Sequence, residues 1–250
     1  MARRLILLAV AAIAVAVWAS QLSLRELLTA DPGWIGLTIL AGALPVPLLA
    51  LRWRAWEDNR ITVIDALHWT GASLLTALAL GPVAGDVTRT VGGEQGFHGV
   101  VKDRIGNTAM AFALAAAAYE PLGLGLVVTS LLLAAAVYRF GWVVAHTAVL
   151  TLGVFAAIGL QIACAARAVG MDLAVAELAT GLPAVLISSL VPVAFLGVTG
   201  RELSVPLIYG ATEALSVSAV LAASTLLGTG TVWLISLVAL RTRTIEESPV

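Results

Sequence analysis

Four charged residues lie in or beside apolar stretches of this 250-residue sequence: Asp86, Arg89, Arg201 and Glu202. A charged side chain at the centre of a bilayer costs about 2.5–3.5 kcal/mol on insertion scales, so each one requires a partner, a water-filled cavity or a function. A guanidinium group offers a planar set of N–H donors that suits phosphate. These residue types therefore indicate an anion-binding site.

The first pair, Asp86 and Arg89, follows a break at Gly81 and Pro82. Their three-residue spacing places both side chains on one helix face, where they can form an ion pair. Gly81 and Gly85 permit close backbone approach. The helix that restarts after Pro82 presents free N–H groups, so this helix end beside Arg89 suits a phosphate. The alternative is a pair that only neutralises itself at an interface.

The second pair, Arg201 and Glu202, follows the glycines Gly197 and Gly200 and precedes a predicted helix. Adjacent residues do not share a helix face, so we expect these two side chains to have different partners. We expect Arg201 to face the ligand and Glu202 to face Arg89. In this arrangement both arginines hold one anion in a wet cavity, while Glu202 and the acid of the first pair keep the empty site near neutral.

Three further titratable residues are weaker candidates for coupling: Asp65, His68 and Glu213. Asp65 and His68 share a helix face by their spacing and could relay protons. The alternatives are an Asp65 that reaches the interface and a His68 that is hydrogen-bonded within the packing. Glu213 is either an interfacial acid or a coupling carboxylate.

Patterns for catalysis or metal binding do not occur in the sequence. The three histidines lack ligand-pair spacing, and neither a Ser/His/Asp order nor paired catalytic carboxylates appear. The single cysteine, Cys164, permits no disulfide within the chain. The glycine-rich loop at 92–99 lacks the Gly-Lys-Ser/Thr ending of a nucleotide-binding P-loop. We therefore predict no enzyme, metal or cofactor. His146 and Gln161 are expected to make interhelical hydrogen bonds.

The elements that position these residues are predicted to be transmembrane helices. The chain is 60% hydrophobic and 12% charged, whereas soluble domains are about 45–50% apolar and about 25% charged. Since about 20 apolar residues form one helical span, spans use nearly all of residues 1–250 and leave no soluble domain. The net charge of −1 gives no field for nucleic acid, so lipid is the expected partner.

We predict an all-α polytopic membrane protein with about six full spans and two broken segments. The full spans are residues 5–19, 34–51, 105–119, 122–138, 142–166 and 214–240. Residues 61–101 and 172–213 are apolar but interrupted, the second at Pro183 and Pro192, so we expect two re-entrant hairpins. Two such segments of opposite direction are typical of inverted-repeat transporters. A cleaved signal peptide is the alternative for residues 5–19.

Basic residues indicate how the chain is oriented. The predicted inner side holds Arg3, Arg4, Arg52, Arg54, Arg60, Lys102, Arg104, Arg139, Arg241 and Arg243. The predicted outer side holds only Arg25 and Arg167. This asymmetry predicts a multi-pass cell-membrane protein with cytoplasmic N- and C-termini. Residues 52–60 are expected to be a cytoplasmic loop with interfacial tryptophans.

These motifs together resemble the lysylphosphatidylglycerol synthase transmembrane region, also called the flippase-like integral membrane protein family. The similar features, spread over about residues 5–240, are Arg52-Trp53-Arg54, Gly81-Pro82, Gly85-Asp86, Arg89, Asp103-Arg104, Pro192, Gly197 and Arg201-Glu202. Thr199 departs from the family, which usually has a glycine there.

The resemblance implies a lipid translocase, which moves a phosphate-containing, polar-headed lipid between leaflets. Arg89 and Arg201 would then hold the phosphate. Lipid synthesis is not expected, because the sequence contains no soluble aminoacyl-transferase domain. The alternative is a non-catalytic membrane scaffold or accessory subunit of a lipid-linked glycosyltransferase pathway, with a glycosyltransferase or lipid-synthesis enzyme as partner.

Overall fold

The structure, a computed structural model, describes residues 29–93, 96–119, 124–188, 194–195, 198–209 and 213–246. Apart from turns and connections, these residues form helices and one pair of two-residue strands. Four helical stretches among them are long and apolar enough to cross a membrane: Pro32–Trp56, Val63–Leu80, Trp142–Ala168 and Leu215–Arg243. The chain is therefore an all-α, membrane-embedded protein. The predicted span at 5–19 lies outside the described residues, as do Pro192 and Gly197.

Helices α3 (Pro32–Ala43) and α4 (Pro45–Trp56) form the first described span. The Asp31 carboxylate caps α3 by accepting hydrogen bonds from the first-turn N–H groups of Gly33 and Trp34. Helix α4 continues through most of the predicted loop at 52–60. It ends only where Asp58 and Asn59 adopt positive φ angles.

The prediction of a loop at Arg52 and Trp53 is therefore wrong. Arg52 is 3% exposed and Trp53 is fully buried. Nothing in the Arg-Trp-Arg sequence breaks a helix, and a buried acid on another helix compensates the charge of Arg52, as described below.

Helices α5 (Val63–Leu80) and α6 (Pro82–Gly92) form a helical hairpin, and α7 (Phe97–Tyr119) follows. The predicted break is confirmed, because Gly81 has a φ of 98°, where glycine is favoured, and Pro82 starts α6. A Cβ on Gly85 would lie 2.6 Å from the Ser73 carbonyl oxygen. Only glycine therefore allows α6 to pack this closely against α5.

The second half contains α8 (Leu124–Phe140), α9 (Trp142–Ala168), α10 (Val175–Ser188), β1 (Ala194–Phe195), β2 (Val198–Thr199), α11 (Gly200–Tyr209) and α12 (Glu213–Glu246). Strand β1 pairs antiparallel with β2, with Ala194 opposite Thr199. Helix α10 continues through Pro183, so the predicted break at that residue is wrong. Neighbouring helices can stabilise a helix that contains proline.

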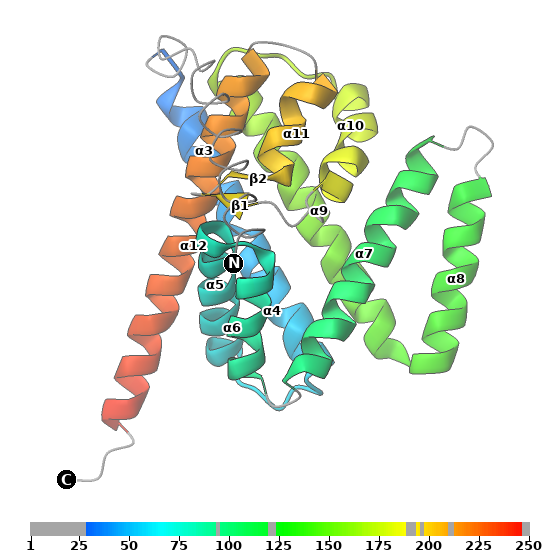
Figure 1. The fold of residues 1–250 in the computed structure, drawn as a ribbon, viewed down its shortest axis with the longest axis vertical. Coiled ribbons are helices and arrows are strands. Elements are labelled where there is room, and N and C mark those ends of the chain that lie inside the picture. Colours follow the sequence, from blue (N-terminus) through cyan, green and yellow to red (C-terminus); the bar gives the residue numbers. More distant parts are fainter. Residues whose placement is uncertain are drawn as a thin grey trace, which may run out of the picture.

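The two hairpins occupy opposite ends of the molecule. Figure 1 shows α5 and α6 side by side in the lower half and α10 and α11 in the upper half, while α9 and α12 run between the ends. Strand β1, at the tip of the second hairpin, lies against α5. One hydrophobic core joins α9, α10, α11 and α12 through Ile162, Val185, Val205 and Leu221.

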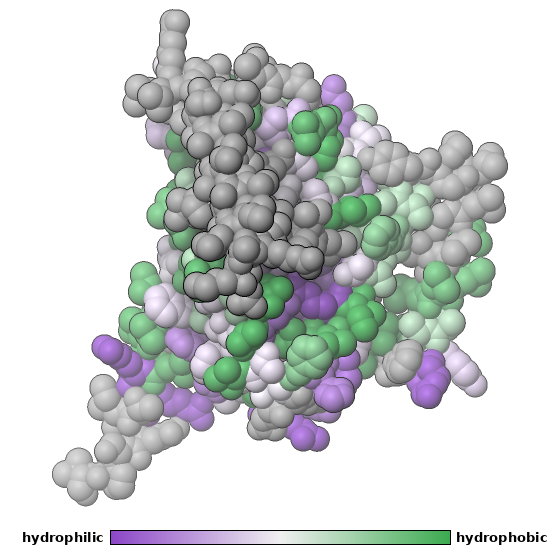
Figure 2. All heavy atoms as spheres, viewed as in Figure 1, coloured by the Kyte–Doolittle hydropathy of each residue, from purple (hydrophilic) through white to green (hydrophobic). Residues whose placement is uncertain are grey.

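Hydrophilic residues are prominent at one end of the molecule (Figure 2). Figure 2 shows hydrophilic residues gathered at the lower end of the molecule, around the C-terminal part of α12 and the corner between α8 and α9. Arg139 in the last turn of α8 and Arg243 in the last turn of α12 are exposed. Large apolar side chains such as Leu132 on α8 and Leu234 on α12 are exposed along the helices. This distribution fits helices that face lipid.

Candidate functional site

The first arginine cluster consists of Arg52, Arg89, Asp103, Asn107 and Thr151, from α4, α6, α7 and α9. Arg52 Nε and Nη2 donate to the two oxygens of Asp103 at 2.6 and 3.0 Å. Arg52 Nη1 donates to Asn107 Oδ1 at 2.9 Å and to Thr151 Oγ1 at 3.1 Å. All three nitrogens of Arg52 thus have acceptors, and the residue fastens three helices together.

In the described residues, fewer N–H donors of Arg89 than of Arg52 have hydrogen-bond acceptors. Its Nη1 donates to Asp103 Oδ2 at 2.8 Å, and its guanidinium carbon lies 5.0 Å from the centre of the Trp53 ring. Its Nε and Nη2 are buried and have no hydrogen-bond partner within the described part of the chain. A buried donor without a partner costs about 1–3 kcal/mol. Arg89 therefore retains donors that a ligand could use.

Asp103 is a single carboxylate between two guanidinium groups. It precedes the apolar part of α7 and lies outside the four candidate spans. Burial alone would raise the pKa of Asp103, but Arg89 and Arg52 outweigh burial and lower this pKa to about 2. Asp103 is therefore ionised at neutral pH. The fully buried Glu57 lies near this cluster, since a Cβ on Gly93 would lie 2.8 Å both from Glu57 Oε1 and from the Trp53 ring.

The predicted ion pair between Asp86 and Arg89 is wrong. Asp86 Oδ1 instead lies 2.8 Å from Arg104 Nη2, in a pair that is partly exposed. The start of α7 supplies both Arg104 for Asp86 and Asp103 for Arg89, and these contacts replace the one within α6. Arg89 also lies in the last turn of α6, about 10 Å along the helix from Pro82, so it does not stand beside the N-terminus of α6.

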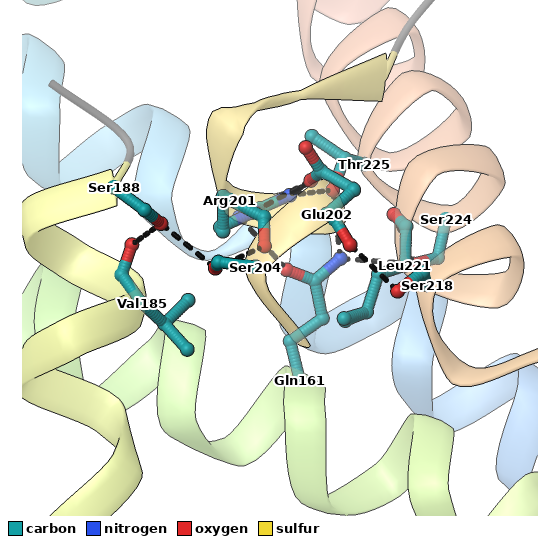
Figure 3. A network of polar contacts seen from close by, with 10 residues as sticks. All are labelled: Gln161, Val185, Ser188, Arg201, Glu202, Ser204, Ser218, Leu221, Ser224 and Thr225. Atoms are coloured by element: carbon teal, nitrogen blue, oxygen red, sulfur yellow. Dashed lines mark hydrogen bonds and ion pairs between the residues drawn. The ribbon is translucent and has the colours of Figure 1, made fainter. Parts of the chain in front are cut away.

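The second arginine cluster consists of Arg201, Glu202, Gln161, Thr225 and Ser224, from α11, α9 and α12 (Figure 3). Arg201 Nε donates to Glu202 Oε1 at 2.6 Å, and Arg201 Nη2 donates to the same oxygen. Nη2 also donates to Thr225 Oγ1 at 2.6 Å, and Nη1 donates to Gln161 Oε1 at 3.5 Å. Every nitrogen of Arg201 therefore has an acceptor.

The expectation that Arg201 and Glu202 have different partners is wrong, as is the expected contact between Glu202 and Arg89. Both residues lie in the first turn of α11 and are buried, and the long Arg201 side chain turns back onto its neighbour. Ser218 on α12 donates to the Glu202 carbonyl oxygen at 2.7 Å. These contacts fix the beginning of α11 against the last span.

The predicted interhelical role of Gln161 is confirmed. Its Nε2 donates to Ser224 Oγ at 2.8 Å and to Thr225 Oγ1 at 3.0 Å. A Cβ on Gly42 would lie 2.6 Å from this nitrogen, so α3 also approaches closely. His146, by contrast, is exposed.

The two clusters are separate. Thr151 of the first and Gln161 of the second are ten residues apart on α9, which corresponds to about 15 Å along the helix. In the described residues Arg89 bonds to Asp103, whereas Arg201 bonds to Glu202, Gln161 and Thr225, so the two arginines share none of these partners. The structure therefore does not bring these two arginines into the single cluster that the sequence predicted.

The remaining predicted residues have other surroundings. Asp65 accepts a hydrogen bond of 2.5 Å from Thr62 Oγ1 in the capping motif of α5. His68 stacks on Trp233 with ring centres 5.9 Å apart, and its Nδ1 is buried without a partner in the described structure. No hydrogen bond joins Asp65 to His68 there. Glu213 begins α12, and its side chain lies outside the described residues.

Sequence reasoning missed a pocket of about 470 Å³ between α4, α7, α8 and α9. Its polar lining includes Arg52, Lys102, Asp103 and Asn107, and its apolar lining includes Met110 and Leu133. The signal in the sequence is the spacing of Gly106, Met110 and Ala113, which puts small and flexible residues on one face of α7. A second pocket, of about 430 Å³, is lined by the acids Asp172 and Glu177 and does not suit an anion.

Comparison of the chain with protein-family models, with curated proteins and with solved structures gives no match. The resemblance to the flippase-like family therefore stays a prediction, and the site rests on its own geometry. In the described residues no group of three or more His, Cys, Asp or Glu side chains could hold a metal ion. The chemistry that the first cluster offers is anion binding by a buried guanidinium group.

Proposed function

We propose that this chain is a flippase-like translocase that moves a phosphate-containing lipid between leaflets, with Arg89 as the phosphate-binding residue. One observation carries the proposal: Arg89 is buried, yet its Nε and Nη2 have no acceptor in the described structure. Phosphate oxygens form strong, charge-assisted hydrogen bonds with such donors. A phosphate bound there would remove the penalty of two unsatisfied groups.

The neighbours of Arg89 would position it for this role. Asp103 holds one Nη, the Trp53 ring supports the guanidinium face, and Arg52 holds Asp103 from the other side. In this proposal Arg201 and Glu202 do not contact the phosphate but fix the second hairpin. Gly85 allows α6 to pack closely on α5, and Arg89 of α6 lies over the Trp53 ring of α4.

We further propose that α5–α6 and α10–α11 are re-entrant hairpins in an inverted-repeat arrangement with about six full spans. Their positions at opposite ends of the molecule support this arrangement. So does the parallel composition of the clusters, since each joins the span before a hairpin, the second hairpin helix and the following helix. The basic ends of α8 and α12 support cytoplasmic N- and C-termini.

Leaflet exchange of a fluorescent phospholipid in reconstituted vesicles tests the function. We expect Arg89→Gln to reduce the exchange rate by at least about tenfold, the equivalent of one strong hydrogen bond. Arg60→Gln is the matched control, because Arg60 is exposed within the α4–α5 connection. Thermal unfolding in detergent shows whether both variants are folded.

Wild-type exchange by a folded Arg89→Gln variant would refute the assignment of Arg89. If the wild-type chain moves no lipid but co-purifies stoichiometrically with a membrane glycosyltransferase, the scaffold function replaces the translocase.

A further inference from the structure

The pocket between α4, α7, α8 and α9 is amphipathic. Arg52, Lys102, Asp103 and Asn107 supply polar groups from the end of α4 and the first turns of α7. Beyond them the lining is mainly apolar, with Met110 on α7 and other residues on α8 and α9, and Thr147 and Thr151 add hydroxyl groups from α9. Its volume of about 470 Å³ lies within the range of small-molecule sites, about 300–1,000 Å³. Such a pocket suits one charged head with a hydrocarbon chain.

The polar end carries one net positive charge, from two cations and one carboxylate. Both oxygens of Asp103 accept a bidentate hydrogen bond from Arg52, so this carboxylate repels an anionic ligand only weakly. The Asn107 Oδ1 atom accepts from Arg52, which directs the amide oxygen to the arginine and leaves the amide NH2 group as a donor. Lys102 adds an ammonium group at the pocket. A single positive charge with nearby donors is complementary to a phosphodiester.

The apolar part is formed by α7, α8 and α9. On α7 the lining residues Gly106, Met110 and Ala113 follow one helix face. Leu132 and Leu133 line it from α8, and Leu132 is 66% exposed at the surface. Figure 1 shows α8 at the edge of the molecule, and it packs mainly against α7 and α9. In a membrane, lipid tails surround the outer face of α8. The pocket therefore lies next to lipid tails.

We infer that this pocket binds an anionic glycerophospholipid from the leaflet, with its phosphodiester at Lys102 and Asn107 and one acyl chain between α7 and α8. The inference rests on the proposed function, because it names the site from which the phosphate reaches Arg89. Asp103 links the two places, since it accepts hydrogen bonds from both Arg52 at the pocket and Arg89 beyond it.

The test is photo-crosslinking in nanodiscs of phosphatidylcholine that contain a small fraction of phosphatidylglycerol with a diazirine in one acyl chain. We expect the labelled peptides to contain Met110 and Leu133. Ala136→Phe fills the pocket from α8, whereas Ala135→Phe makes the same change at an exposed neighbour that is not part of the lining. Ala136→Phe should lower labelling by about tenfold, and Ala135→Phe should leave it unchanged.

Head-group recognition is tested by Lys102→Gln, with Arg139→Gln on α8 as the control for an exposed cation. Lys102→Gln should remove the preference for labelled phosphatidylglycerol over equally labelled phosphatidylcholine, while Arg139→Gln should retain it. Labelling spread evenly along the exposed face of α8, with no difference between the two phenylalanine variants, would overturn the inference.

The binding assay requires no lipid movement, so it separates this inference from the proposed function. Localised labelling without leaflet exchange would refute translocation and support the pocket. Unlocalised labelling together with wild-type exchange by Ala136→Phe would refute the pocket and leave translocation standing.

Discussion

The two arginine clusters have the same plan but different hydrogen bonding. Each joins the span before a hairpin, the second helix of that hairpin and the helix that follows. In the second cluster Arg201 has acceptors for all of its nitrogens, from Glu202, Gln161 and Thr225. In the first, Asp103 is shared by two guanidinium groups, and Arg89 keeps two buried nitrogens without partners in the described structure.

In our proposal, this difference gives the same structural plan two purposes. A saturated cluster fixes a hairpin to its neighbours, because moving any member breaks several buried hydrogen bonds. A cluster whose N–H donors lack partners within the described residues can form hydrogen bonds with a ligand. We therefore propose that the second cluster supports the fold and that the first cluster binds the ligand.

The largest effect is expected from Asp103→Asn. This variant leaves two buried arginines without an ionised partner, and loss of one member of a buried pair destabilises by about 3–5 kcal/mol. The free energy of unfolding in detergent or mixed micelles measures it. Asp172→Asn, in the exposed pair with Arg167, is the control and should change it by only about 0–1 kcal/mol. Equal stability of Asp103→Asn and wild type would contradict the central place of Asp103.

Glu202→Gln should destabilise less. Glutamine still offers an oxygen to Arg201, which also keeps Gln161 and Thr225 as acceptors. We expect a loss of about 1.5–3 kcal/mol, the contribution of a hydrogen bond to a charged group. The same unfolding measurement applies, and a loss larger than that of Asp103→Asn would show that the Arg201–Glu202 pair contributes more to stability than the Asp103 carboxylate does.

The hairpins themselves can be compared through two glycines. A Cβ on Gly85 would lie 2.6 Å from a backbone oxygen of Ser73, whereas a Cβ on Gly181 would meet the end of the Tyr209 side chain at 2.6 Å. Backbone cannot move aside as easily as a side chain. Gly85→Ala should therefore destabilise by about 1–3 kcal/mol, and Gly181→Ala by less. Gly36→Ala, which meets nothing within 4 Å, is the control. A larger loss in Gly181→Ala would show that the second hairpin is the tighter one.

Local features of the fold could be predicted from the sequence, and partners across helices could not. The break at Gly81 and Pro82 depends on the conformations of these two residues, so it was predictable. The ion-pair partner of Arg89 could not be predicted, because Asp103 reaches Arg89 only through the packing of α7 on α6. Spacing favoured Asp86 as that partner, but Arg104 competes for Asp86 from another helix.

The missed role of Arg52 has the same cause. Its position after an apolar run suggests the end of a span, and only the contacts with Asn107 and Thr151 show that it is part of the interior. The spacing of Gly106, Met110 and Ala113 marks only the α7 wall of the pocket, and the sequence does not show which other three helices complete it. Six spans and the orientation of the termini stay predictions.

The most direct test of our account compares leaflet exchange by Arg89→Lys and Arg201→Lys in the same vesicles. Both changes keep a positive charge beside its acid, but lysine lacks the planar fork that binds phosphate oxygens in pairs. We predict that Arg89→Lys lowers exchange by at least about tenfold, while Arg201→Lys, when folded, retains most of the wild-type rate. Equal losses in the two variants, or no loss in Arg89→Lys, would contradict the division between a binding cluster and a supporting one.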